Sequence, residues 1–293
     1  MRIIRPLLAV LLITVVIFGI LSCEDNDDAI ENPAIGDYDL SEAAVSAEGY
    51  TKVFEDNFNT NLDLWEVWTG GAYNNELQYY QEPNLVVADG VLQIKAKKET
   101  IEGLSTSGSG ELKTFNYTSG RIESNFEIAP DAVNGKVRIS ARIKLPKGYG
   151  MWPAFWSYGN PWPTHGEIDI LEALGGTATY TTDYFYGPEE GTVITNDELT
   201  VATITSEKDL TDSYHVYEVI WSQTSLVFML DGVIVDTKLA SAPGNDYIPE
   251  LFGKLQHIAL NLAVGGDIFP NFDADKIETA DMYVDWVKVY TAK

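Results

Sequence analysis

Short apolar runs, broken at regular intervals by turn residues, dominate the chain from Gly49 onward. LVVADGVLQIKA places two such runs around Asp89-Gly90, and LVFMLDGVIVDT repeats the arrangement around Asp231-Gly232. Asp-Gly between two strand-like runs is a strong signal for a β-hairpin. No long stretch keeps the 3.6-residue periodicity of a helix. The pattern therefore predicts an all-β protein.

Further strand candidates are HIALNLAV (257–264) and MYVDWVKVY (282–290), and no internal repeat or second-domain linker interrupts the sequence between 49 and 293. Two polar stretches, 99–118 and about 188–213, are expected to be loops. Many strands in one domain of this length are typical of two large antiparallel sheets packed face to face. We expect a β-jelly-roll sandwich over residues 49–293.

The N-terminus has the pattern of an export signal. An apolar run over 7–21 follows two arginines, and it is too short for a transmembrane helix. Small Ser22 before Cys23 resembles a bacterial lipoprotein signal, in which the cysteine is lipidated. Cys23 is also the only cysteine, so no intrachain disulfide can form. We expect a signal peptide over 1–22 and lipidation at Cys23; an ordinary signal peptide with a chance cysteine is the alternative.

The segment after Cys23 is strongly acidic. Residues 24–48 carry nine acidic side chains and no Lys or Arg. Such a segment repels itself and has little to bury, so residues 23–48 are expected to form a flexible tether. Acids directly after the cysteine resemble surface-export signals of Bacteroidetes lipoproteins. We therefore expect an exported protein that is anchored by lipid to the outer membrane, at the cell surface.

The charge balance excludes one class of partner. The chain has 19 basic and 44 acidic residues, for a net charge of −25. Phosphate binding needs a basic patch, so we expect no nucleic-acid partner. Anionic polymers are disfavoured for the same reason, although a local basic groove would reverse this. The protein is expected to be a monomer.

The stretch GEIDILEALGG (166–176) concentrates three carboxylates. Glu167 and Asp169 are two residues apart, so on a strand they share a face, and Ile168 and Ile170 hold the opposite face to the core. Glu172 is five residues beyond Glu167 and would point the other way on a regular strand. A solvated face of alternating acids is the alternative reading of this pattern.

A β-bulge would bring the third acid into step. One extra residue around Ile170-Leu171 shifts the alternation by one, so that Glu172 rejoins the face of Glu167 and Asp169. Two glutamates on one groove suit retaining glycoside hydrolysis, in which one attacks the anomeric carbon and the other protonates the leaving oxygen and later activates water. The aspartate between them can hydrogen-bond the nucleophile, and its charge raises a neighbour's pKa.

Tryptophans precede the acids. MWPAFWSYGNPWPTHG (151–166) holds Trp152, Trp156 and Trp162. Flat aromatic faces stack on the apolar C–H faces of sugar rings, so aromatics beside acids indicate a glycan site. Core packing is the alternative, above all for Trp156.

GEIDILE resembles the E-x-D-x-x-E signature of glycoside hydrolase family 16. FEDNFN, NNELQYY, VVADGVLQI, TSGRIES, ARIKLPKGYGMWPAFW, NLAVGG and MYVDWVKVY follow in family order over residues 50–293, and are most similar to the laminarinase-like branch of endo-β-1,3-glucanases. The resemblance implies a concanavalin-like jelly roll with a glucan groove and no catalytic cofactor. It also implies Glu167 as nucleophile, Asp169 as its helper and Glu172 as acid/base.

The resemblance implies a set of substrate-binding residues. Trp162 corresponds to the family's sugar platform, and Trp152 and Trp156 to its WPAFW motif. Arg121 in TSGR and Asn75 in NNELQ correspond to polar residues of the groove; a surface salt bridge and a turn are the respective alternatives.

Two departures concern the groove. The family's histidine on the strand after the signature is missing from TYTTDYFYGPEE, and only His165, just before the signature, could reach the groove. The tryptophan that usually follows NLAVGG is also missing, so Phe269 in DIFPNF is expected to substitute as a platform. Both departures leave the glucan linkage open.

The resemblance further implies a structural Ca²⁺ on the convex side. Its ligands would be Glu55, the carbonyl of Gly90 and Asp285, and oxygen ligands suit this cation. Such a site would stiffen the fold without taking part in the chemistry.

The expected function is endo-acting, retaining hydrolysis of β-1,3 or mixed β-1,3/1,4 glucans such as laminarin. The alternatives are a family 16 hydrolase of agar, porphyran or carrageenan, or a non-catalytic glycan-binding surface lipoprotein.

Overall fold

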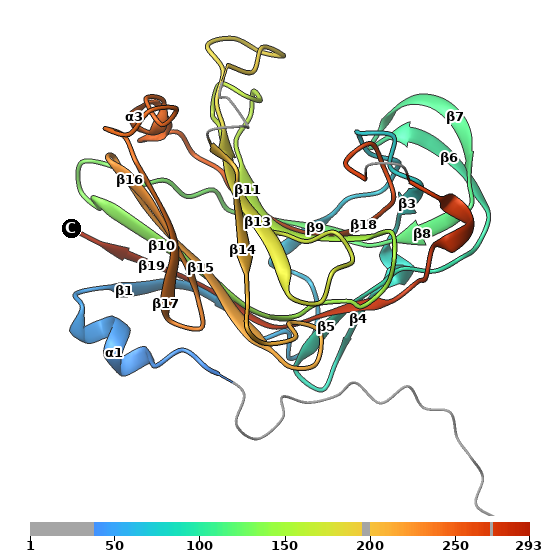
Figure 1. The fold of residues 1–293 in the computed structure, drawn as a ribbon, viewed down its shortest axis with the longest axis horizontal. Helices are drawn as coiled ribbons and strands as arrows, with labels where there is room; N and C mark the ends of the chain where they lie inside the picture. Colours follow the sequence, from blue (N-terminus) through green and yellow to red (C-terminus); the bar gives the residue numbers. More distant parts are fainter. Residues whose placement is uncertain (1–37, 195–199, 270–271) are drawn as a thin grey trace, which may run out of the picture.

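The computed structural model describes residues 38–194, 200–269 and 272–293. Two antiparallel sheets packed face to face form its body (Figure 1). The strands of the larger sheet are β1 (Thr51–Asp56), β4 (Leu85–Ala88), β5 (Val91–Lys95), β10 (Lys136–Lys144), β15 (His215–Ser222), β16 (Ser225–Leu230), β17 (Val233–Leu239) and β19 (Asp281–Ala292). Their order is β17-β16-β15-β10-β19-β5-β4, and β1 also pairs with β19.

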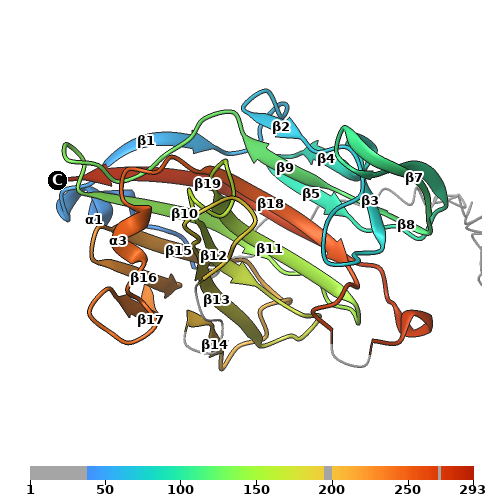
Figure 2. The same cartoon turned by 90° about the horizontal axis from the view of Figure 1, so that it is seen from above.

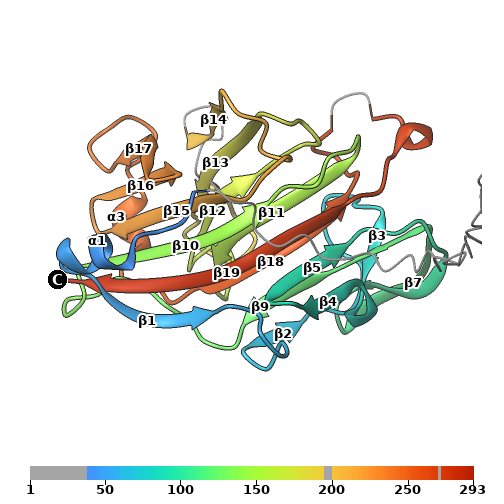
Figure 3. The same ribbon diagram turned by 90° about the horizontal axis from the view of Figure 1, so that it is seen from below.

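The second sheet carries the signature strand. Its members are β2 (Trp65–Val67), β9 (Arg121–Ser124), β11 (Met151–Tyr158), β12 (Glu167–Glu172), β13 (Thr179–Phe185), β14 (Ala202–Thr205) and β18 (His257–Val264). They follow the order β14-β13-β12-β11-β18-β9-β2. The long central strands of the two sheets run lengthwise through the molecule (Figures 2 and 3). The predicted sandwich is confirmed.

Alternation along the strands places the core between the sheets. In β10, Val137, Ile139, Ala141 and Ile143 are fully buried in one hydrophobic cluster. Side chains two apart on a strand share a face, so one face of β10 seals the core and the other carries its polar residues.

Small elements complete the fold. Two further strand pairs are β3 (Gln78–Tyr80) with β8 (Tyr117–Ser119), in parallel, and β6 (Ile101–Thr106) with β7 (Ser109–Phe115), antiparallel. The helices are α1 (Glu42–Ala47), η1 (Glu82–Asn84), α3 (Ile248–Leu251) and η2 (Ala274–Lys276). The loop expected over 99–118 is therefore wrong: its polar residues form an exposed hairpin, in which cross-strand hydrogen bonds replace the missing apolar burial.

The structure also shortens the expected tether. Residues 38–48 pack on the outer face of the larger sheet, where Leu40 and Val45 join Trp286 and Tyr290 in a second hydrophobic cluster (Figure 1). Ser41 caps α1 by accepting a hydrogen bond from the Ala44 N–H at 3.3 Å. Tyr38, Leu40 and Val45 dock this segment despite its acidic composition.

The signal peptide, Cys23 and the rest of the expected tether lie outside the described residues. Within the described ranges, no helix combines the length and the apolar character needed to cross a membrane.

Candidate active site

The out-of-step glutamate is brought into line by a bulge. On β11, Ala154 pairs with Glu172 and Phe155 with Leu171, but the next residue pairs with Asp169, so Ile170 has no partner there. The register against β13 shifts between the same two acids. The predicted bulge is confirmed.

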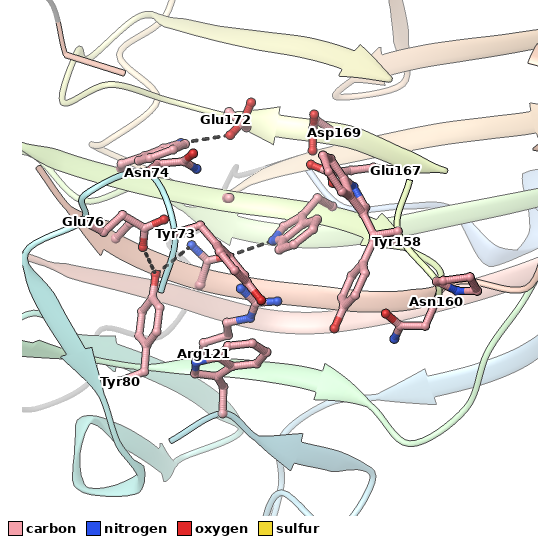
Figure 4. A pocket seen from close by; sticks show the side chains of 18 of the residues that line it. Tyr73, Asn74, Glu76, Tyr80, Arg121, Tyr158, Asn160, Glu167, Asp169 and Glu172 are labelled. Atoms are coloured by element: carbon pink, nitrogen blue, oxygen red, sulfur yellow. Dashed lines mark hydrogen bonds between the residues drawn. The ribbon is translucent and has the colours of Figure 1, made fainter. Parts of the chain in front are cut away.

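The bulge divides the strand cleanly between two environments. Ile168, Ile170 and Leu171 are buried in the core between the sheets. Glu167, Asp169 and Glu172 all line one groove on the outer face of the seven-stranded sheet, with a cavity volume of about 770 Å³ (Figure 4). Glycine is required just before this strand: Gly166 has φ +78°, and a Cβ there would lie 2.2 Å from Leu251 Cδ2.

Two tryptophans hold the two glutamates in place. Trp162 Nε1 donates to Glu167 Oε2 at 2.5 Å, and Trp152 Nε1 donates to Glu172 Oε1 at 3.0 Å. Each bond fixes a carboxylate and an indole ring together in the groove. The interpretation of these tryptophans as groove residues is thus compatible with the structure, although Trp152 itself is largely buried.

Burial raises the pKa of each of the three signature acids. It raises the pKa of Glu167 to about 8, with the charge of Glu172 adding to the effect and the Trp162 N–H opposing it. It raises the pKa of Glu172 to about 7, opposed by the Trp152 N–H. Desolvation penalises the ionised form, and these groups interact, so the protons come off the set as a whole.

Asp169 is the most deeply buried of the three acids. Burial, followed by the charges of Glu172 and Glu167, raises the pKa of Asp169 well above its usual range. Its side chain is 2% exposed, and its Oδ2 has no hydrogen-bond partner among the described residues. A protonated Asp169 is therefore available to donate to a neighbour, and Glu167 lies beside it (Figure 4).

Arg121 forms the opposite part of the groove floor. Its guanidinium lies 4.2 Å from the ring centre of Trp68 and 4.9 Å from that of Trp156. Its Nη2 also bonds Glu123 at 2.6 Å. Arg121 and Trp156 thus lie in the groove together, as the sequence predicted, but the arginine is not a free cation.

Two of the predicted substrate-binding residues, Asn75 and Phe269, are not among the residues that line the groove. Asn75 does not line the groove, because its side-chain amide donates to Asp267 at 2.7 Å, and the adjacent Asn74 lines it instead. Phe269 does not line it either: its ring packs 5.3 Å from that of Phe272 and 6.4 Å from that of Tyr149. Neighbouring residues in a turn point in different directions, and a motif match does not resolve which one enters the groove. His165 is likewise absent from the groove lining.

The residues proposed for calcium do not fit a cation site. Glu55 already bonds Lys52 at 2.6 Å and lies 3.6 Å from Lys288. Asp285 accepts from Arg142 at 2.7 Å. Both carboxylates are neutralised by the protein's own cations, which would repel Ca²⁺. In the described part of the chain, no group of three or more His, Cys, Asp or Glu side chains is arranged to hold a metal.

Several groove residues escaped the sequence analysis. They come from the loop before β3, from β3 itself, from β11, from the segment after β13 and from β18, and include Trp68, Tyr73, Glu76, Tyr80, Tyr158, Glu190 and Asn261. Tyr158 had a usable signal, because it continues the even-numbered face of β11 after Trp152 and Trp156. Asn261 had another, as a lone amide in the apolar run HIALNLAV.

The chain matches known proteins over most of its length. A glucan endo-1,3-beta-glucosidase A1 from Niallia circulans is 30% identical over an alignment that covers 83% of this chain and 38% of that relative. The chain spans about a third of the length of such longer curated relatives.

Two solved structures share the fold. The endo-beta-1,3-glucanase of Pyrococcus furiosus is 31% identical with a TM-score of 0.67, covering 83% of this chain and 95% of that one. The laminarinase catalytic domain of Thermotoga maritima MSB8 is 27% identical with a TM-score of 0.68, covering 84% and 99%. Residues 74–288, more than half of the chain, match the model described as Glycosyl hydrolases family 16. The chain therefore belongs to glycosyl hydrolase family 16.

Proposed function

We propose that this protein is an endo-acting, retaining hydrolase of β-1,3 or mixed β-1,3/1,4 glucans such as laminarin. The observation that carries the proposal is the bulge of β12, which turns Glu167, Asp169 and Glu172 into one groove beside two tryptophans. The names of the similar proteins, which are endo-β-1,3-glucanases and a laminarinase, favour this substrate class.

In the proposed reaction, Glu167 and Glu172 act in two successive steps. A Glu167 carboxylate oxygen bonds the anomeric carbon while the glycosidic C–O bond breaks, and Glu172 gives its proton to the departing oxygen. Water then attacks the same carbon as Glu172 takes its proton, and Glu167 leaves as a carboxylate. Inversion occurs twice, so the configuration is retained.

These roles need an ionised Glu167 and a protonated Glu172. Burial and the neighbouring charges leave the pKa of Glu167, at about 8, above that of Glu172, at about 7. A hydrogen bond from protonated Asp169 would reverse this order, because it stabilises the carboxylate that accepts it. Arg121 already lowers the pKa of Glu167, but not by enough to reverse the order without that hydrogen bond.

Charge in the groove favours a neutral polymer. Five acids line it, namely Glu76, Glu167, Asp169, Glu172 and Glu190, whereas Arg121 is the one basic residue among the described lining and is paired with Glu123. Sulfated galactans such as porphyran and carrageenan would be repelled, which disfavours them as substrates. A purely binding protein has no use for three buried acids, since their burial costs stability.

Products distinguish these functions. The protein lacking residues 1–22 is incubated with laminarin, lichenan, agarose and carrageenan, and the products are sized over time. We expect short oligosaccharide mixtures early from laminarin or lichenan. Cleavage of a galactan alone would favour the second substrate class, and binding without cleavage would favour the non-catalytic alternative.

We also propose that the protein is a monomer exported and anchored at the outer membrane, on the cell surface, through lipidated Cys23. The short apolar run ending in Ser22-Cys23 supports this, and two acyl chains give durable attachment. The Cys23→Ala variant is expected to be found in the soluble fraction instead of the membrane fraction. Retention of that variant in the membrane would contradict the anchor, and light scattering of the soluble protein checks the monomer.

A further inference from the structure

Glu76 is a buried carboxylate in the groove that the two-step reaction does not use. It lies in the loop before β3, outside the seven-stranded sheet that carries the three signature acids, and its side chain is only 9% exposed. In Figure 4, Glu76, Asn74 and Tyr80 lie on one side of the groove, and Tyr158 and Asn160 lie on the other. Burying a carboxylate is costly, so its presence here calls for a reason.

A chain of hydrogen bonds ends at this carboxylate. Trp156 Nε1 donates to Asn261 Oδ1 at 2.8 Å, and Asn261 Nδ2 donates to the Tyr80 hydroxyl at 3.3 Å. That hydroxyl in turn donates to Glu76 Oε2 at 3.2 Å, where Gln78 Nε2 also donates at 2.7 Å. Every donor points the same way, so the acceptor at the end sets the direction of the whole chain.

The other end of the chain is a sugar-facing surface. Trp156 lines the groove, and the Arg121 guanidinium lies 4.9 Å from its ring centre. An indole can rotate about its side-chain bonds unless its N–H is held. The bond to Asn261 provides that restraint, and Tyr80 restrains Asn261.

Glu76 also faces the acids. It lies on the Glu172 side of the signature carboxylates in Figure 4, and its charge is one of the causes that raise the pKa of Glu172. Burial raises the pKa of Glu76 itself, opposed by the hydrogen bond from Gln78, the charge of Arg121 and the hydrogen bond from Tyr80. Once ionised, Glu76 favours the proton on Glu172.

We propose that Glu76 is a positioning residue for glucan hydrolysis: it anchors the Tyr80–Asn261–Trp156 hydrogen-bond chain that orients the Trp156 platform, and it keeps a negative charge facing Glu172. This proposal rests on the function proposed above. It separates two effects, one carried by the charge of Glu76 and one by the hydroxyl of Tyr80.

Two conservative variants separate these effects. Glu76→Gln keeps an oxygen that accepts from Tyr80 and Gln78 but removes the charge. We expect the alkaline limb of its kcat/KM profile on laminarin to move to lower pH by about 0.5–1 unit, with KM little changed. Tyr80→Phe keeps the charge but breaks the chain. We expect KM to rise about 2–10-fold, which corresponds to the loss of one hydrogen bond. The alkaline limb of the kcat/KM profile should stay at the wild-type pH.

The effect of Glu76 on the ionisation of Glu172 can also be measured without substrate. Trp152 donates to Glu172, so tryptophan fluorescence in the substrate-free protein is expected to follow the ionisation of that acid. The midpoint should fall in Glu76→Gln. Glu111→Gln, on the exposed β7 strand, is the matched control and is expected to behave as the wild type.

The outcomes are distinct. An unmoved alkaline limb and fluorescence midpoint in Glu76→Gln, or an unchanged KM in Tyr80→Phe, would overturn the proposal. So would variants that lose only melting temperature and keep wild-type kinetics. Failure of the wild type to cleave any β-1,3 glucan overturns the proposed function instead, and the fluorescence titration still decides whether Glu76 acts on Glu172.

Discussion

Buried acids on the two faces of this sandwich are treated in opposite ways. On the outer face of the larger sheet, Glu218 is fully buried, and its Oε2 accepts from Arg138 and Ser140, each at 2.7 Å. In the groove, Glu167 and Glu172 are bonded only by indole N–H groups among the described residues, and Asp169 Oδ2 has no partner there.

The difference separates stability from reactivity. A buried acid paired with an arginine holds its strands together, and removing one partner of such a pair is strongly destabilising. Buried acids without a cation have raised pKa values, so they exchange protons near neutral pH. Buried acids thus stabilise the fold on one face and are candidates for proton transfer and catalysis on the other. Substitutions on each face test this comparison.

The largest effect is expected at Glu167. Glu167→Ser removes the proposed nucleophile, so no glycosyl-enzyme should form and hydrolysis of every substrate should be abolished. Reducing-sugar release from laminarin and from an aryl glucoside measures this, with melting temperature as the control for folding. Substantial activity in a folded variant would exclude Glu167 as nucleophile.

Glu172→Ala is expected to be selective rather than total. Loss of general acid–base help should slow glucan hydrolysis by about 10²–10⁴-fold. An aryl glucoside with a good leaving group needs little acid help, so its first step should survive, and azide should restore turnover by replacing water. Wild-type rates on glucan would mean that Glu172 takes no part in the reaction.

On the outer face the large effect should be on folding. Glu218→Ala leaves Arg138 buried with one acceptor fewer, so we expect the free energy of unfolding to fall by about 3–5 kcal/mol. Denaturant titration measures it, and substitution of the exposed Glu66 in β2 by Ala should change it by less than about 0.5 kcal/mol. A small loss at Glu218 would remove the distinction between the two faces.

Asp169→Asn should lower the activity and raise the stability of the protein at alkaline pH. The folded protein holds protons on the groove acids that the unfolded chain has released, so wild-type stability falls as pH rises from about 4.5 towards 8. The amide cannot ionise, so at pH 8 we expect a melting temperature higher by about 2–4 °C and an intermediate loss of activity. A lower melting temperature at pH 8 would show that the carboxyl stabilises the fold.

The smallest effect is expected from calcium. Glu55 and Asp285 are already paired with lysine and arginine, so chelation should leave the melting temperature unchanged. A site filled at a hundred times its Kd would add about 2.7 kcal/mol, which a thermal scan with EDTA or added CaCl₂ detects. Stabilisation by calcium would mean that these ion pairs open to admit the metal.

The sequence alone determined the features that depend on local spacing. Alternation and Asp-Gly turns specified the sandwich, and the five-residue step from Glu167 to Glu172, read with the two isoleucines, specified the bulge. These depend only on the two-residue period of a strand and on which face must be buried.

Only the tertiary structure decided the contacts between distant segments. Tyr80 and Asn261, which carry the chain from Glu76, are 181 residues apart, and their meeting depends on how β3 and β18 come together. Likewise, Asn74 rather than Asn75 enters the groove, and residues 38–48 dock instead of remaining a tether. A local pattern fixes the face on which a side chain lies, but the partner it meets there is supplied by strands whose register is set by packing across the whole domain.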